Sequence, residues 1–242
     1  MKDGAAYFGG YLENGRRKKD EVLRRQMLTL DIDEAYDGLW DDVIMAWGGY
    51  NKVMHNTHSH TPENPRVRIV VPLAESVTPE QYEAIARKFA EQVGFEHFDP
   101  TTFDVNRFMY WPSHPKDGTF YYESEEGEFL DGYTVLNMYS DWKDVTLWPG
   151  MDEDFTRAIN QKLQHPHEKA GIIGALCRAY TIEEAIETFL PETYTRGSVP
   201  GRWTYAHGSA ANGAIEYDEV FLHSHHGTDP VGGKTVNVYD LV

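Results

Sequence analysis

Residues 27–33, with the sequence MLTLDID, alternate strictly between apolar and polar side chains. The apolar positions are Leu28, Leu30 and Ile32, and the polar positions are Thr29, Asp31 and Asp33. A period of two residues predicts a half-buried β-strand, with each set of side chains on its own face. The polar face ends in two carboxylates about 7 Å apart, the spacing of residues i and i+2 in a strand.

Two like charges at this distance repel each other, and a cation between them would relieve the repulsion. Mg²⁺ and Mn²⁺ prefer carboxylate oxygens and commonly bind substrate phosphates as well. Asp31 and Asp33 are therefore candidate metal ligands, although a solvated strand end is the simpler interpretation of an isolated Asp-x-Asp pair. On this reasoning, removing either charge should leave the fold intact or slightly more stable.

Composition limits the class of protein. The chain has 242 residues, of which 40% are hydrophobic, and this is enough for one large domain or two small ones. It contains no apolar run long enough to span a membrane. Cys177 is the only cysteine, which excludes an internal disulfide and a cysteine-based zinc finger and favours a reducing cytoplasm.

The net charge of −17 argues against a general nucleic-acid coat. Residues 1–30 nevertheless carry a net charge of +3, and four of their basic residues are consecutive: Arg16, Arg17, Lys18 and Lys19. This basic strip would contact a polyanion such as a template strand or a triphosphate. An ordinary solvated run of charges is an equally good interpretation.

The order of predicted elements indicates an α+β protein. Strands are expected at 7–12, 27–33, 67–71 and 107–111, helices at 39–47 and 79–93, and an aromatic, acidic hairpin at 119–135. The helix at 79–93 has the clearest signals, because Thr78 and Gln81 form a capping box around Pro79. These elements predict helices over a mostly antiparallel sheet.

A change in the sequence pattern near residue 150 suggests two parts, residues 1–150 and residues 151–242. The second part is expected to be smaller and mainly helical, with helices at 155–163, 170–180 and 182–190. Gly- and Pro-rich loops with a few short strands follow. His223, His225, His226 and Asp229 lie in this region and are either loop residues with structural roles or metal ligands.

Two further clusters carry candidate chemistry. His55, His58 and His60 precede a strand on which Arg66 and Arg68 share one face. Paired guanidinium groups match phosphate oxygens, and a His-x-His pattern suits a metal ion or a phosphate. The second cluster, FDPTTFDVNRFMYWP, offers Asp99 and Asp104 as carboxylates, followed by Arg107 at the start of a strand.

The order of these motifs resembles that of the archaeo-eukaryotic primase superfamily, whose three motifs read hydrophobic-DhD/E, sxH and hD. The matching segments here are Leu30-Asp31-Ile32-Asp33, His58-Ser59-His60 and Phe98-Asp99, followed by Asn106-Arg107. The likeness is greatest to phage and mobile-element primase-polymerases that precede a virulence-associated-E-type superfamily 3 helicase. In these proteins THSHTPE-PR-R, TT…R-MYWPS, DW and SHH-TDP…DLV recur together, so the resemblance covers nearly the whole chain.

The resemblance implies an RRM-like palm that makes and extends primers by two-metal nucleotidyl transfer. Asp31, Asp33 and Asp99 would be the catalytic residues and would hold two Mg²⁺ or Mn²⁺ ions about 4 Å apart. His58, His60, Arg66, Arg68 and Arg107 would bind the triphosphate of an NTP or dNTP, and Arg16 to Lys19 would touch a single-stranded DNA template. The second part would help to bind the template or the initiating nucleotide, or would link to the helicase.

The chain departs from the family pattern in two respects. His58 stands where the second motif has a small residue, so His58, His60 and Arg68 remain alternatives for its functional position. No GxxxxGK[ST] motif is present, so a partner helicase would lie elsewhere in a longer protein or in the replisome. A phage or mobile-element protein of this kind is expected in the cytoplasm of a bacterial host, with no membrane partner.

Two other functions compete with primer synthesis. A rolling-circle-type endonuclease also uses paired histidines, but Ser59 stands where its His-hydrophobic-His motif has a bulky apolar residue. A non-catalytic nucleic-acid-binding module would make the carboxylates incidental. Metal-dependent incorporation of nucleotides on a single-stranded template distinguishes the three.

Overall fold

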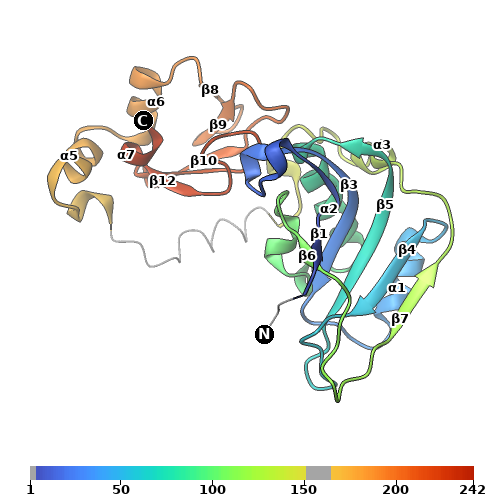
Figure 1. Cartoon of the computed structure of the whole chain (residues 1–242). Helices are drawn as coiled ribbons and strands as arrows, with labels where there is room; N and C mark the ends of the chain where they lie inside the picture. The colour runs from blue at the N-terminus through green and yellow to red at the C-terminus, as the bar shows by residue number, and fades with distance from the viewer. Residues whose placement is uncertain (1–3, 151–164) are drawn as a thin grey trace. The chain divides into compact units, whose positions relative to one another are not determined.

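The computed structural model describes residues 4–150 and 165–242, and these form two compact units, Met1–Ser140 and Asp141–Val242. Figure 1 shows the elements of both units. The division lies about ten residues before the boundary expected from the sequence. Residues 143–145 belong to the second unit because the Val145 N–H donates to the Ala211 carbonyl and the Asn212 amide donates to Asp144.

The first unit is built on a five-stranded antiparallel sheet with the strand order β2-β3-β5-β4-β7. The strands are β2 (Gly10–Leu12), β3 (Val22–Ile32), β4 (Lys52–Asn56), β5 (Val67–Val77) and β7 (Tyr122–Glu125). A separate two-stranded sheet pairs β1 (Ala6–Tyr7) with β6 (Met109–Tyr110). The three helices are α1 (Leu39–Trp47), α2 (Pro79–Val93) and α3 (Gly132–Leu136). Four short 3-10 helices complete the unit: η1 (Glu13–Gly15), η2 (Lys19–Glu21), η3 (Phe95–His97) and η4 (Pro100–Phe103).

The core confirms the alternation of residues 27–33. Leu28, Leu30 and Ile32 are fully buried, and the apolar face of α2 packs over β3 with Tyr82, Ile85 and Phe89 equally buried. Thr29 and Asp31, on the other face of β3, are also buried, because β6 crosses that face. The strand is therefore buried on both faces at Asp31 instead of on one, and it ends at Ile32, one residue before Asp33.

Other predicted elements hold with local changes. The helices at 39–47 and 79–93 are found with the expected bounds, and the capping box of Thr78 and Gln81 is formed. The strand expected at 7–12 is divided between two sheets, and only Met109 and Tyr110 remain of the strand expected at 107–111. The prediction of a hairpin at 119–135 is wrong. The first part of this segment contains β7, which pairs with β4, and the second part forms α3.

The second unit contains a five-stranded antiparallel sheet in sequential order from β8 to β12. Its strands are β8 (Tyr194–Arg196), β9 (Arg202–Tyr205), β10 (Ala214–Tyr217), β11 (Phe221–Ser224) and β12 (Thr235–Asn237). The helices are α5 (Gly171–Ala179), α6 (Ile182–Phe189) and α7 (Val238–Leu241), with η5 (Val145–Leu147) and η6 (Pro166–Glu168).

The helices expected at 170–180 and 182–190 are present in this unit, and the helix expected at 155–163 lies outside the described residues. The few short strands expected in its loops join into one sheet, which packs on α5 to α7 around a core of its own. In its described residues, the second unit is thus α+β and not mainly helical. Within the described residues, no helix is long and apolar enough to cross a membrane.

Candidate functional site

The register of the first sheet aligns four polar or aromatic residues across neighbouring strands. Asp31 on β3 lies opposite Arg68 on β5, Arg68 lies opposite His55 on β4, and His55 lies opposite Tyr122 on β7. Directly opposed residues of antiparallel strands project to the same face, so the four side chains form one row. This face is the one crossed by β6 and turned away from the core of α2.

Backbone hydrogen bonds bring Asp99 to the same place. The Asp99 N–H donates to the Asp31 carbonyl at 2.9 Å, and the Asp33 N–H donates to the His97 carbonyl at 3.2 Å, so residues 97–99 run antiparallel to residues 31–33. The Asp99 carboxylate caps η4 by accepting from the Thr101 N–H and hydroxyl. The three predicted carboxylates therefore lie on adjacent segments at one end of β3.

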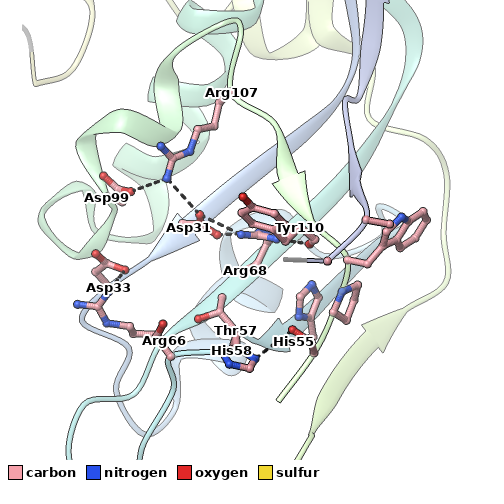
Figure 2. Close-up of a pocket in the computed structure, with 16 residues that line it drawn as sticks. Asp31, Asp33, His55, Thr57, His58, Arg66, Arg68, Asp99, Arg107 and Tyr110 are labelled. Carbon is pink, nitrogen blue, oxygen red and sulfur yellow. Dashed lines mark hydrogen bonds and ion pairs between the residues drawn. The ribbon is translucent and has the colours of Figure 1, made fainter. Parts of the chain in front are cut away.

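Each carboxylate is paired with a different arginine. Arg68 binds both oxygens of Asp31, with Nε and Nη2 donating at 2.7 and 3.1 Å, and its Nη1 donates to the Tyr110 carbonyl at 2.8 Å. Arg107 Nη2 lies 3.2 Å from Asp99 and 3.9 Å from Asp31. Arg66 Nη1 lies 3.2 Å from Asp33. Figure 2 shows these interactions.

The six side chains line a pocket of about 510 Å³. The other lining residues come from the N-terminal segment, from β4 with the loop after it, and from β6 with the loop after it: Gly4, Ala5, His55, Thr57, His58, Ser59, Tyr110, Trp111, Pro112 and Ser113. The Asp31–Arg68 pair is almost buried. In the Asp33–Arg66 pair, the side chain of Asp33 is 43% exposed and that of Arg66 is 34% exposed. The pocket is thus closed around Asp31 and open around Asp33.

The carboxylates are suitable in chemistry for a hard divalent cation. Nη2 of Arg107 already places positive charge within 4 Å of both Asp31 and Asp99, where a bound metal ion would also be favoured. Within the described ranges, however, no three His, Cys, Asp or Glu side chains form a preorganised metal site. The donor set fits a divalent ion on condition that Arg107 moves away from the space between these two carboxylates.

The histidines differ from the expected arrangement. His58 lines the pocket, and its Nδ1 lies 3.2 Å from the Ser113 hydroxyl. His60 does not line the pocket; its Nδ1 accepts from the Arg66 N–H at 3.1 Å, and its ring packs edge-on against Tyr121. His60 therefore orders the loop that presents Arg66. Of the two histidines, only His58 lines the pocket, whereas His60 bonds to the Arg66 backbone.

His55 is a pocket residue that the sequence placed in a histidine cluster without predicting a role for it in the site. It lies on β4, a strand that the sequence did not predict, and its Nδ1–H donates to the Asn56 carbonyl at 2.8 Å. Burial lowers its pKa, and the positive charge of Arg68 acts in the same direction against the opposing effects of Asn56 and Asp31. The lowered pKa favours the neutral imidazole, in which Nδ1 carries the proton and Nε2 the lone pair.

The remaining candidates lie outside the pocket lining. In the basic strip, the Arg17 guanidinium lies 4.0 Å from the centre of the Phe108 ring, and Lys19 pairs with Asp104 at 2.6 Å, while Arg16 and Lys18 are exposed. Asp104 is thus an ion-pair partner of the strip, not a fourth carboxylate of the pocket.

The polar residues of the second unit form a hydrogen-bonded cluster. Asp229 is buried and accepts from the hydroxyls of Tyr194 and Ser224. His226 Nε2 accepts from the Tyr205 N–H, and His223 Nδ1 lies 2.9 Å from the Thr235 hydroxyl. These contacts support structural roles, and the described part of the chain contains no preorganised metal site here either.

Among solved structures, the primase-polymerase domain of Cyanophage S-2L (its AEP domain, PP-N190) matches with a TM-score of 0.40 and 13% sequence identity, over 55% of this chain and 69% of that chain. No curated protein matches the present chain. The family model described as "VapE N-terminal domain" matches residues 1–151, which is more than half of the chain and includes every residue of the pocket. The chain therefore belongs to the VapE N-terminal domain family, as its motifs predicted.

Proposed function

We propose that the chain is a DNA-dependent primase-polymerase that synthesises and extends primers by metal-dependent nucleotidyl transfer. The observation that carries this proposal is the convergence of Asp31, Asp33 and Asp99 with three arginines in one pocket. Membership of the VapE N-terminal domain family supports it. Synthesis of this kind needs a triphosphate, a template strand and a divalent cation beside one another. The pocket offers groups for two of these, the triphosphate and the cation.

Asp31, Asp33 and Asp99 would hold Mg²⁺ or Mn²⁺, which would supply charge neutralisation at the transferring phosphate and activation of the attacking hydroxyl. Arg66 and Arg107 each contact carboxylates through one guanidinium nitrogen, so their other guanidinium donors can bind phosphate oxygens. Arg68 is different, because all three of its guanidinium nitrogens are engaged by Asp31 and Tyr110. Arg68 would therefore position Asp31 and reach the triphosphate only after rearrangement.

The charges of the pocket suggest how the components bind. Three carboxylates face three arginines, and the two pocket histidines add no charge when neutral. The charges therefore balance without a ligand. A triphosphate alone would draw the arginines away and leave the carboxylates unpaired. A divalent ion alone would draw the carboxylates away and leave the arginines unpaired. A nucleotide together with its metal ions supplies both signs, so the two should bind cooperatively.

The test is primer extension and de novo synthesis on a single-stranded template with Mg²⁺ or Mn²⁺. The double variant Asp31→Asn/Asp33→Asn should lose both activities, and Asp104→Asn, which removes a carboxylate outside the pocket, should keep them. Asparagine preserves the size of the side chain and leaves an acceptor for the arginine. Full activity in the double variant would refute the proposal.

A second candidate function is binding of a triphosphate or nucleic acid without chemistry. It is favoured by the pairing of each carboxylate with an arginine, which makes a binding site for anions even when no metal is present. In that case, nucleotide binding would be independent of Mg²⁺ and Mn²⁺, and the double variant would bind the nucleotide more tightly because the competing carboxylates are gone.

The wider assignments are also proposals. The basic strip Arg16–Lys19 would contact single-stranded template, and a superfamily 3 helicase would act in the same full-length protein or replisome. The family name refers to the N-terminal domain of VapE, which is consistent with a further domain in such proteins. The bacterial cytoplasm is the expected location for both partners.

A further inference from the structure

Aromatic side chains continue from the pocket across the sheet face that carries Asp31 and Arg68. The His55 ring in the pocket lies 6.1 Å from the ring of Phe120. Phe120 in turn has His114 at 6.2 Å and Tyr122 at 6.3 Å, each with 28° between the ring planes. We call Phe120, Tyr122 and His114 the ring row. Trp111, which lines the pocket, lies 5.1 Å from Tyr7 and adds a further exposed ring at the pocket mouth.

The ring row is exposed although its members are large. Phe120 is 39% exposed, Tyr122 is 63% exposed and His114 is also exposed, and the neighbouring Trp111 is 58% exposed. Folding gains nothing from a set of adjacent aromatic side chains left in water, and contiguous patches of this kind mark binding surfaces. Because the rings border the pocket and one another, a ligand that enters the pocket would pass over them.

The backbone under the ring row is fixed by one buried side chain. The Asn56 amide donates to the Thr119 carbonyl at 2.7 Å and accepts from the Tyr121 N–H at 3.1 Å, and the Asn56 backbone N–H donates to the Tyr121 carbonyl. These bonds hold residues 119–121 beside the end of β4. Phe120 is thereby held toward His55, while Tyr121 packs on His60. A binding surface ordered in advance loses less conformational entropy when its ligand arrives.

The charges around the ring row are also more favourable for binding nucleic acid than those on the rest of this acidic molecule. Residues of β7 alternate between the two faces, so Glu123 and Glu125 point away from Tyr122. Glu125 pairs with Lys52, and its carboxylate accepts from the Gly49 N–H, so part of its charge is compensated on the opposite face. The ring side of β7 carries Tyr122 and Ser124, neither of which repels phosphate.

We propose that the ring row binds single-stranded nucleic acid by stacking on its bases and leads the template strand into the pocket. The proposal rests on the proposed function, since it concerns the template of the same site. Stacking accepts every base, because each base has a flat π-face, and suits a template of unrestricted sequence. It also depends little on salt, unlike the contacts of the basic strip Arg16–Lys19.

The experiment measures binding of a fluorescent oligo(dT) by anisotropy, on the full chain and at several salt concentrations. Phe120→Leu and Tyr122→Leu should each weaken binding by roughly 5-fold to 100-fold, the range for one stacked base, with no change in the slope of log K against log salt. Phe120→Trp should restore binding because it restores a ring. Tyr133→Leu is the matched control, since Tyr133 is also an exposed ring but lies on α3, which packs beside α2.

Binding of a fluorescent nucleoside triphosphate is measured on the same variants and should not change. Oligo(dT) binding that is unchanged in Phe120→Leu and Tyr122→Leu would overturn the proposal, and so would loss of triphosphate binding without loss of oligo(dT) binding. If the proposed function fails but the ring row is correct, Asp31→Asn/Asp33→Asn remains active while the leucine variants still lose oligo(dT).

Discussion

Asp31 and Asp33 are two residues apart but have different surroundings. Asp31 is held by both Nε and Nη2 of Arg68 with little solvent access, whereas Asp33 meets Arg66 at the open edge of the pocket. The sequence alone suggested that either carboxylate could be removed at no cost, because they repel each other. That expectation neglected their partners, which lie on β5 or directly before it and cannot be located without the register of that strand.

Asp31→Ala should therefore destabilise the protein by about 2–4 kcal/mol, because it leaves the guanidinium of Arg68 buried without its counter-charge. Asp33→Ala should cost less than about 1 kcal/mol, because exposed ion pairs contribute little. Urea unfolding of both variants gives the comparison. Equal losses would show that Arg68 finds another partner when Asp31 is absent.

His55 should make stability depend on pH. Its pKa is lowered in the folded protein, so the unfolded chain binds a proton more readily. Stability from this residue is complete above the unfolded pKa of about 6.5 and is lost as the pH falls below it. The stability difference between wild type and His55→Gln should therefore shift in favour of the variant from pH 7 to pH 5.

At the scale of elements, local signals predicted some segments well. The capping box of Thr78 with Gln81 and that of Thr181 with Glu184 both formed, because each needs only residues three positions apart. The strand β4 was not predicted, since its helix-side residues include Lys52 and Asn56, which look like surface residues. Both are buried: Lys52 binds the Trp47 and Tyr50 carbonyls, and Asn56 binds residues 119–121.

Because β4 was not predicted, His55 was noted only as a member of a histidine cluster and not as a residue of the site. His55 reaches the pocket only because β4 pairs with β5 and places it opposite Arg68. Asp31 and Asp33, in contrast, were identified by the alternation of residues 27–33, and only the resemblance to family motifs joined Asp99 to them. No local pattern relates Asp99 to Asp31, whose contact is made by hydrogen bonds between segments almost seventy residues apart.

Arg25 connects the elements that hold Arg107. It is fully buried on β3, donates to the carbonyls of Val105 and Arg107, and contacts the ring of Tyr82 on α2 at 4.2 Å. Burial lowers its pKa. These bonds tie the segment carrying Arg107 to β3 and α2, so Arg25 is a positioning residue for the pocket.

Arg25→Lys should destabilise the protein by about 2 kcal/mol or more, because an ammonium group cannot replace the planar array of guanidinium donors. Triphosphate binding should weaken as well, through displacement of Arg107. The neighbouring Arg24→Lys is the control, since Arg24 is exposed and makes one long bond to the Ser76 carbonyl. Thermal unfolding and nucleotide titration test the two effects separately, and unchanged nucleotide affinity in Arg25→Lys would remove its positioning role.

At the scale of the whole molecule, the two units have separate cores and separate sheets. All the carboxylates and arginines of the pocket lie in the first unit. Starting a strand requires two free nucleotides to be ordered on the template at once, and this entropy cost must be met by contacts beyond those needed for extension. The second unit is the region available to provide them.

A fragment ending at Ser140 should therefore extend an existing primer but should not start a new strand. The cut belongs after Ser140 and not near Pro149, because residues 143–145 bond to residues 211 and 212 and would lose these partners in the longer fragment. Circular dichroism should first show that the fragment is folded, and extension and initiation are then measured on one template. Initiation by the fragment at the level of the full chain would assign the second unit to docking instead of to priming.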